Sequence, residues 1–289
     1  MRGLFAALST DDGKTWPHVR LIADDGPGRA VECTNGGLFN TCQTNAEYQG
    51  YLSVCQSLDG LVHLISSRQH DALNLKVLQT PQPAVSYPPL KVKHVVETFD
   101  GPQFNTDGWV HYRNYTGGFN GKGQYTINSL DRVNGINRLV GKGSFEATFA
   151  VGDIEINPGD GGVTPGPRIM FRDARTRRLS LRFDKDRIAL DIADEETSSP
   201  LKFDRKDEVR YPTPPRLANA RLIWNEDRKQ WRIFYGLNEA EPTTELPQSE
   251  GGICFGKPFS ETTAVYLVVD HGSADFDHFE IKPIENAPK

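Results

Sequence analysis

Glycine and proline recur in turn-like pairs along the whole sequence, and no long amphipathic helical pattern lies between them. The chain of 289 residues holds 27 glycines and 19 prolines, and the segments between them are short, with apolar and polar residues alternating. Alternation with a period of two is typical of strands, and frequent turn residues keep strands short. We therefore predict an all-β fold. With 37% hydrophobic residues the chain can bury a sizeable core.

The net charge and the cysteine content limit which ligands and partner molecules the chain can bind. A net charge of −5 does not favour general nucleic-acid binding, and no run of about 18 apolar residues is present, so we expect no membrane span. The cysteines lack the paired spacing of a zinc site, and we predict no metal and no cofactor. Cys33 and Cys42 bracket a turn, which leaves open one disulfide in an exported protein or two free thiols. The oligomeric state is not indicated.

Proline density divides the chain. Prolines crowd residues 79–94, where they neither continue a helix nor pair in a central strand. We place a linker there, between a first domain at residues 1–78 and a second at residues 95–286. The second is of ordinary size for a β-sandwich.

Residues 9–16 match the pattern Ser-x-Asp-x-Gly-x-Thr-Trp at every defined position. The pattern predicts a hairpin turn in which Ser9 and Asp11 hydrogen-bond the backbone, Gly13 takes a positive φ, Thr15 completes the motif and Trp16 supplies an apolar plug. This motif, the Asp-box or BNR repeat, resembles that of sialidases (neuraminidases) and related β-propeller glycoside hydrolases. In that family the box folds the outer hairpin of a blade, away from the catalytic face, so we expect a structural role.

The resemblance implies that residues 1–78 form the last one to two blades of a propeller. Arg2 precedes the Asp-box strand, where sialidases carry one of three arginines that bind the substrate carboxylate. Tyr51 begins a hairpin whose turn is Asp59-Gly60, and it falls on the position of the catalytic nucleophile. For both residues the alternative is an ordinary surface or packing role.

A broader group of bacterial sialidase-like hydrolases carries Gly-Tyr, Asp-Gly, a histidine, Ser-Arg and a second histidine in its last blade. His63, Arg68 and His70 occupy those positions here and are candidate substrate-binding residues. The aromatic residues that follow the second histidine in that group are replaced by Asp71-Ala72-Leu73-Asn74, which leaves the substrate class open.

The second domain resembles concanavalin-like jelly-roll domains attached to carbohydrate-active proteins. The resemblance lies in Phe99-Asp100-Gly101, Asp107-Gly108-Trp109 and the segment 141–149. Alternating patterns predict strands at 168–171, 179–183, 221–224 and 231–235, with a hairpin turn at 225–229. The closing strand, 274–281, is expected to pair beside the first.

Two features of this domain suit a sugar. Trp109, Tyr112 and Tyr115 lie in a glycine-rich region and are candidates for a sugar platform, with core packing as the alternative. Arginines recur at positions 172, 175, 177, 178 and 182, a run that suits an anionic polysaccharide or, more plainly, a solvated hairpin.

Two hypotheses follow. The first is the C-terminal portion of a sialidase-like exo-glycosidase acting on terminal acidic sugars and exported to the periplasm or the exterior. The family's other arginines, its acid/base aspartate and its glutamate come from earlier blades, so we expect no hydrolysis by this chain alone. The alternative is a carbohydrate-binding or adhesive β-sandwich with a vestigial propeller segment, and a purely structural sandwich is a third. Either of the first two has a glycan or glycoconjugate as its partner.

Overall fold

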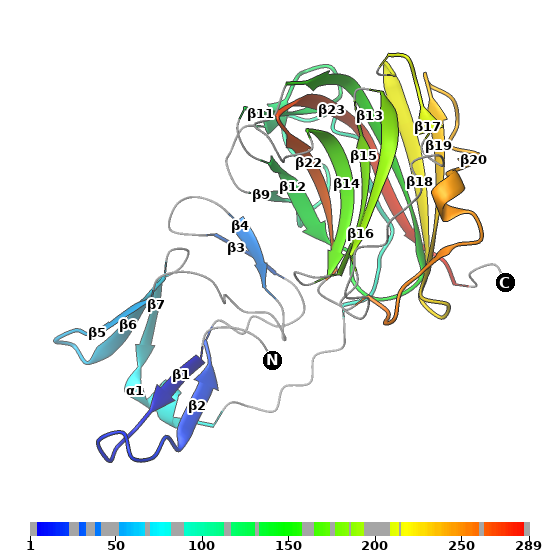
Figure 1. Cartoon of the computed structure of the whole chain (residues 1–289). Helices are drawn as coiled ribbons and strands as arrows, with labels where there is room; N and C mark the ends of the chain where they lie inside the picture. Colours follow the sequence, from blue (N-terminus) through cyan, green and yellow to red (C-terminus); the bar gives the residue numbers. More distant parts are fainter. Residues whose placement is uncertain are drawn as a thin grey trace. The chain divides into compact units, whose positions relative to one another are not determined.

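The computed structural model describes residues 5–22, 29–32, 38–41, 52–66, 70–81, 90–112, 117–130, 133–157, 165–173, 177–184, 186–193, 209–213, 215–259 and 263–285. The chain divides into two compact units, Met1–Pro89 and Leu90–Lys289. The regular elements of both units are almost all strands (Figure 1), so the predicted all-β class is confirmed.

The first unit contains small antiparallel sheets. Its elements are β1 (Phe5–Leu8) paired with β2 (His18–Leu21), β3 (Arg29–Glu32) paired with β4 (Leu38–Thr41), and the meander β5 (Ser53–Gln56), β6 (Leu61–Ile65) and β7 (His70–Asn74). The helix α1 (Leu75–Gln79) follows, and the Asn74 side chain caps it by accepting from the Val77 amide. Within the described ranges each sheet has two or three strands rather than the four of a propeller blade. The propeller assignment therefore stays a prediction.

The predicted hairpin around Asp59-Gly60 is present. β5 and β6 pair in register from Ser53 opposite Ile65 to Gln56 opposite Val62. Gly60 has φ +85°, which an L side chain rarely adopts, and the Leu61 amide donates to Asp59 Oδ1. The turn is therefore built by the two residues that the pattern singled out.

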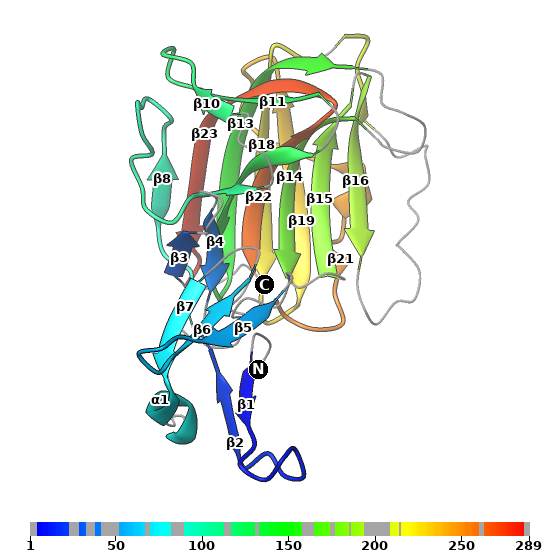
Figure 2. The same ribbon diagram turned by 90° about the vertical axis from the view of Figure 1, so that its left-hand side faces the viewer.

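The second unit is a sandwich of two antiparallel sheets, visible as two layers in Figure 2. The larger sheet has nine strands in the order β10-β11-β23-β13-β18-β19-β20, with β8 beside β23 and β21 beside β19. Its strands are β8 (Val95–Glu97), β10 (Gly117–Phe119), β11 (Tyr125–Ser129), β13 (Phe145–Ile156), β18 (Leu217–Asn225), β19 (Gln230–Leu237), β20 (Thr244–Glu245), β21 (Ile253–Cys254) and β23 (Gly272–Pro283). A short 3-10 helix, η2 (Pro247–Ser249), lies between β20 and β21.

The smaller sheet has seven strands in the order β17-β16-β15-β14-β22-β12-β9. These are β9 (Val110–Tyr112), β12 (Asn134–Leu139), β14 (Gly166–Asp173), β15 (Arg177–Phe183), β16 (Arg187–Ala193), β17 (Val209–Arg210) and β22 (Ala264–Asp270). None of the helices in the described part of the chain is long and apolar enough to cross a membrane.

Apolar and polar residues alternate along the strands, so one face of each sheet packs on a shared core. The Phe171 ring of the smaller sheet lies 5.3 Å from Phe145 and 4.9 Å from Trp231, both in the larger sheet. All three side chains are almost fully buried. Aromatic pairs at such spacings add to the free energy gained by burying their area, so these contacts fix how the two sheets face each other.

Three details predicted for this domain are confirmed. The closing strand β23 pairs with the first strand β8, with Phe279 opposite Glu97. β18 and β19 form a hairpin with Trp224 opposite Trp231. The turn between them is closed by the Lys229 amide, which donates to the Glu226 carbonyl.

A buried carboxylate anchors the loop that follows β8. Glu97 is fully buried, and its oxygens accept from the amides of Phe99, Asn105 and Thr106 and from the Thr106 hydroxyl. Burying a charge is tolerated when hydrogen bonds replace the lost water. The loop 98–106 is thus wrapped around one side chain.

Candidate functional site

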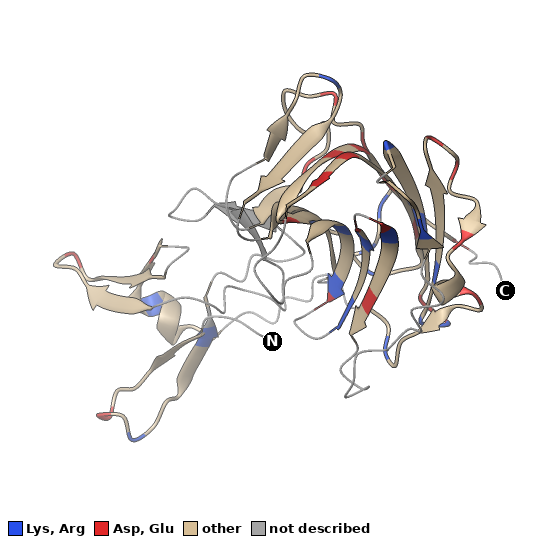
Figure 3. Ribbon diagram, turned by 45° about the horizontal axis from the view of Figure 1, so that its top comes forward, with Lys and Arg blue, Asp and Glu red and all other residues tan. Residues whose placement is uncertain are grey.

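The outer face of the seven-stranded sheet carries an unusual number of charged side chains. Core residues alternate with outward residues along each strand. The residues next to the buried Ile169, Phe171, Leu179 and Leu181 along β14 and β15 therefore point away from the core. We call this surface the arginine face, and we define it by the residues Arg168, Arg172, Arg178, Arg182, Arg187, Asp184, Asp191, Asp270, Tyr112 and Tyr266. Figure 3 shows Lys and Arg in blue on neighbouring strands of the sandwich.

Strand register places like charges side by side. Arg168 of β14 is directly opposite Arg182 of β15, and four residues along, Arg172 is opposite Arg178. Side chains opposite each other in an antiparallel pair have Cβ atoms about 5 Å apart, and like charges in these positions repel. The sheet therefore holds two arginine pairs that need neighbouring carboxylates.

Three aspartates form ion pairs with arginines of this face. Arg168 Nη2 lies 2.8 Å from Asp270 Oδ2, and Arg178 Nη2 lies 3.0 Å from Asp191 Oδ2. Asp184 is ion-paired with Arg182 and also with Arg187, whose Nε is 3.0 Å from Asp184 Oδ2. One carboxylate thus serves two guanidinium groups.

The environment of the two central pairs differs. The side chains of Arg168 and Asp270 are only 22% and 9% exposed, whereas those of Arg178 and Asp191 are 41% and 40% exposed. Burial lowers the pKa of Arg168, and the neighbouring Asp270 acts in the opposite direction. Of these two pairs, Arg178–Asp191 is the more open to solvent.

Two tyrosines meet on the same face, and one of them, Tyr266, borders the arginines of β14. The rings of Tyr112 (β9) and Tyr266 (β22) meet edge to face, with centroids 5.1 Å apart, and both are partly exposed. Tyr266 is directly opposite Met170 of β14, so Arg168 and Arg172 are its diagonal neighbours. The face therefore combines aromatic surface with fixed donors and acceptors.

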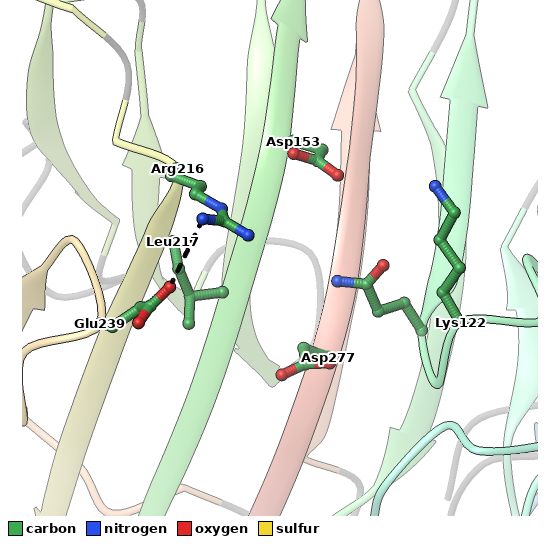
Figure 4. A pocket seen from close by; sticks show the side chains of 7 residues that line it. Lys122, Asp153, Arg216, Leu217, Glu239 and Asp277 are labelled. Carbon is green, nitrogen blue, oxygen red and sulfur yellow. Dashed lines mark ion pairs between the residues drawn. The ribbon is translucent and has the colours of Figure 1, made fainter.

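A polar pocket of about 390 Å³ lies on the nine-stranded sheet (Figure 4). The pocket is lined by Lys122, Gln124, Asp153, Arg216, Leu217, Glu239 and Asp277. Asp153 sits at an irregularity in the pairing of β13 with β23 and has φ +44°. Burial raises the pKa of Asp277, and the nearby carboxylates Asp100 and Asp275 raise it further. With no aromatic side chain in its lining, this pocket suits a sugar less well than the arginine face does.

The aromatic platform predicted from sequence is only partly realised. Trp109 is 5% exposed and packs in the core, with its ring 5.2 Å from Phe279 and its Nε1 donating to Thr106 Oγ1. It offers no face to a ligand, because it is buried just before β9 begins, whereas Tyr112 at the end of β9 is partly exposed. Tyr115 lies outside the described residues, as do Arg2, Tyr51, Arg68, Cys33 and Cys42.

The structure brings His63 and His70 together. Their rings stack with centroids 5.2 Å apart, and His63 Nδ1 is 3.0 Å from His70 Nε2. His63 Nε2 is also 3.0 Å from Ser57 Oγ, and Ser57 hydrogen-bonds Asp59 at the β5–β6 turn. This chain of contacts fixes the turn. Across the part of the chain that the structure describes, no group of three or more His, Cys, Asp or Glu residues is arranged to hold a metal ion.

The Asp-box forms a hydrogen-bonded turn between β1 and β2. Asp11 accepts from the Thr15 amide at 2.8 Å and from the Thr15 hydroxyl at 2.6 Å, and Ser9 Oγ accepts from the Gly13 amide. Gly13 has φ +80°. Trp16, however, is 55% exposed, so the expected apolar plug is not formed. A two-stranded sheet provides no second layer for a large ring to enter.

Several members of the arginine face were missed from the sequence, namely Arg168, Arg187, Asp184, Asp191, Asp270 and Tyr266. Asp270 is 102 residues from its partner Arg168, and no local pattern links them. The one available signal was the arginine run itself, of which Arg172, Arg178 and Arg182 belong to the face. Arg177 instead is buried and pairs with Asp173.

Comparisons with known proteins give structural neighbours alone. No sequence-family description matches the chain, and no curated protein matches it. Among solved structures, the seed lectin of Lotus tetragonolobus has a TM-score of 0.42 at 11% identity, covering 68% of this chain and 100% of that one. The winged bean acidic lectin, in complex with methyl-α-D-galactose, has a TM-score of 0.42 at 12% identity, covering 65% and 98%. Arcelin-5, a lectin-like defence protein from Phaseolus vulgaris, has a TM-score of 0.41 at 11% identity, covering 65% and 96%. Similarity of this degree does not assign the chain to a family.

Proposed function

We propose that the second unit is a carbohydrate-binding module and that its arginine face holds the glycan. The observation that carries the proposal is the placement of Tyr266 diagonal to Arg168, which is paired with Asp270, with the Tyr112 ring against Tyr266 and the pair Arg178–Asp191 on the same sheet face. The proposal rests on this face and not on the structural neighbours.

The chemistry of the face suits a sugar. A sugar hydroxyl both donates and accepts hydrogen bonds, and an Arg–Asp pair presents donors and an acceptor side by side. Because Arg178 and Asp191 already hold each other at 3.0 Å, fewer rotamers are lost when a ligand binds. The tyrosine rings supply apolar surface for the C–H side of a pyranose. These two features are sufficient for a site that binds a sugar without catalysing a reaction.

Substitution of the tyrosines tests the proposal. We expect the whole chain to bind members of a glycan array, and we expect Tyr266→Ala to weaken that binding by roughly tenfold or more, since an anchoring aromatic side chain contributes at least about 1.4 kcal/mol. Tyr112→Ala, on the edge strand β9, is a second variant that disturbs the sheet less. Unchanged thermal unfolding shows that each variant is folded.

Trp16→Ala provides the matched control. Its ring is more exposed than either tyrosine, yet it lies on the Asp-box hairpin. If glycan binding is unchanged in both tyrosine variants and is lost in Trp16→Ala, the site lies in the first unit and the proposal is refuted.

A second candidate function is sialidase-type hydrolysis by a longer protein that contains the earlier blades. The hydrogen-bonded Asp-box turn at Ser9, Asp11 and Thr15 favours it. In such a protein Tyr51 would be the nucleophile and Arg2 the carboxylate-binding residue. Tyr51→Phe is expected to abolish turnover of a sialoside, and wild-type turnover by that variant would eliminate the assignment.

A further inference from the structure

We infer that His63 and His70 form a surface site for a divalent transition-metal ion such as Zn²⁺ or Ni²⁺, held by His63 Nδ1 and His70 Nε2. The site belongs to the first unit and is independent of the carbohydrate-binding function proposed for the second. This role differs from the substrate-binding role that the resemblance to sialidase-like hydrolases implies for the two histidines.

Strand register places the two rings on one face of the three-stranded meander. His70 of β7 is directly opposite Ile65 of β6, and His63 lies two residues before Ile65 on the same strand. The two histidines are therefore diagonal neighbours on a single face, at a separation that long side chains can bridge. Their ring centroids are 5.2 Å apart. His70 is exposed and His63 is partly exposed, so an ion in the solvent can reach the pair.

A chain of hydrogen bonds on the far side of His63 fixes its tautomer. The Ser57 hydroxyl donates to the Asp59 carboxylate, and this bond holds the pKa of Asp59 below its ordinary value. Because the one hydroxyl proton of Ser57 is used there, its oxygen accepts from His63 Nε2, 3.0 Å away. In the neutral ring His63 Nε2 therefore carries the proton, and Nδ1 presents a lone pair toward His70.

This arrangement is the one that metal-binding histidines commonly have. Their second ring nitrogen usually donates a hydrogen bond that orients the ring and fixes which nitrogen is free to bind the metal. In this protein the bond from His63 goes to Ser57, which is itself held by Asp59. The ring of His63 is thus oriented as a ligand before any ion arrives.

The separation of the two facing nitrogens suits a shared ion. Zinc lies about 2.0–2.1 Å from a histidine nitrogen, so two nitrogens on one ion, at angles from about 90° to the tetrahedral value, are about 2.9–3.4 Å apart. His63 Nδ1 and His70 Nε2 are 3.0 Å apart. Without an ion, His70 Nε2–H donates to His63 Nδ1 across this gap. When an ion binds, that proton leaves Nε2, His70 Nδ1 carries the ring proton instead, and the exposed His70 ring turns so that both lone pairs meet the ion.

The donor atoms determine which ions fit. Imidazole nitrogens are typical ligands of Zn²⁺, Ni²⁺ and Cu²⁺, whereas Mg²⁺ and Ca²⁺ prefer oxygen. Among the residues that the structure describes, no group of three or more His, Cys, Asp or Glu residues is placed to hold an ion. The pair therefore supplies two ligands, and the other positions on the ion are open to water or to a donor atom of another molecule.

The test is a calorimetric titration of the whole chain with Ni²⁺ and with Zn²⁺ at neutral pH, with Mg²⁺ as the comparison. We expect one transition-metal ion to bind per chain, and we expect no saturable binding of Mg²⁺. Nitrogen NMR of the histidine rings is a second readout that needs no variant. Zn²⁺ is expected to shift the signals of His63 Nδ1 and His70 Nε2 and to leave those of His94 unchanged.

Variants locate the ion. His70→Gln removes a ligand and is expected to weaken Ni²⁺ binding by roughly tenfold or more, at least as much as the loss of an outer partner does. Ser57→Ala keeps both ligands but removes the bond that orients His63, and we expect a loss of about tenfold. The matched control is His94→Gln, at an exposed histidine whose Nε2 lies 2.8 Å from Glu280 Oε1. This control is expected to leave binding unchanged. Thermal unfolding without added ion shows that each variant is folded.

The thiol of Cys55 needs a control of its own. Cys55 is exposed on β5, directly opposite His63, and thiolates bind the same ions. Cys55→Ser is expected to leave the Ni²⁺ affinity unchanged, because both protein ligands are imidazole nitrogens.

Any of three results would overturn the inference. The first is the absence of saturable binding of Ni²⁺ and Zn²⁺ by the wild-type chain. The second is wild-type affinity in folded His70→Gln. The third is a loss in Cys55→Ser or His94→Gln as large as the loss in His70→Gln, which would place the ion on other ligands.

Discussion

Arg168 on β14 and Arg182 on β15 lie directly opposite each other, and each is ion-paired with a different carboxylate, Asp270 for Arg168 and Asp184 for Arg182. The sheet thus tolerates two adjacent guanidinium groups by bringing in aspartates from the end of β22 and from the residue that follows β15. The stability of this sheet therefore depends on ion pairs whose members come from different strands.

Asp270→Asn is expected to destabilise the protein. The change leaves Arg168, only 22% exposed, beside Arg182 without its 2.8 Å partner, and we expect a loss of about 1–3 kcal/mol in the free energy of unfolding. Urea denaturation measures it. Asp186→Asn is the control, because its pair with Arg210 is more than half exposed on both sides and should contribute about 0–1 kcal/mol. Equal losses from the two changes would contradict the importance of the buried pair.

Glu97→Ala is expected to be more severe. It removes the acceptor for the amides of Phe99, Asn105 and Thr106 at a site with no access to water, so we expect a loss of about 3–5 kcal/mol. Thermal unfolding would show the loss, and Trp109 fluorescence would report loosening of the loop. Glu245→Ala, which loses the exposed partner Arg232, should change stability by about 1 kcal/mol or less.

Gly135→Ala probes the close approach of β12 and β22. A Cβ at Gly135 would lie 2.0 Å from the Leu267 carbonyl oxygen, so the strands must separate, and we expect a loss of about 1–3 kcal/mol. Gly118→Ala is the control, since a Cβ there has no neighbour within 4 Å. If both variants unfold at the same urea concentration as the wild type, the close approach has no energetic weight.

Asp11 is expected to titrate at unusually low pH. The Thr15 hydroxyl and amide, with Ser9, lower the pKa of Asp11 from 3.8 to about 2. Since the folded pKa lies below the unfolded one, the stabilising contribution is present above pH 3.8 and is lost as the pH falls through about 2. Titration of the Asp11 carboxyl carbon by NMR gives the midpoint. Thr15→Val should raise it, whereas Thr10→Val, at an exposed position on the same turn, should not. A midpoint near 3.8 in the wild type would show that the turn does not form.

The strands of the sandwich were largely predictable because alternation reports burial. The segments around Phe171, Leu181, Leu222 and Ile233 read as strands from sequence and are strands in the structure. The pairing of the closing strand with the first also followed from the jelly-roll resemblance. These features were predictable because they depend on sequence patterns that are only a few residues long.

The candidate site was not predictable in the same way. Alternation marks Arg172 and Arg178 as outward residues, but only strand register shows that they stand opposite each other. The sequence equally cannot indicate that Asp270 lies beside Arg168, or that Trp109 turns inward while Tyr112 does not. Partners distant in sequence are set by tertiary packing, which local periodicity does not contain.

Protection of arginines from chemical labelling tests the central claim most directly. A dicarbonyl reagent modifies exposed guanidinium groups, and mass spectrometry measures the modification of each arginine with and without the array glycan that binds best. We predict that this glycan protects Arg172 and Arg178 on the arginine face and leaves Arg232 on the opposite sheet unchanged. Equal labelling of Arg178 in the free and bound protein, or protection confined to Arg216 at the pocket, would contradict the account.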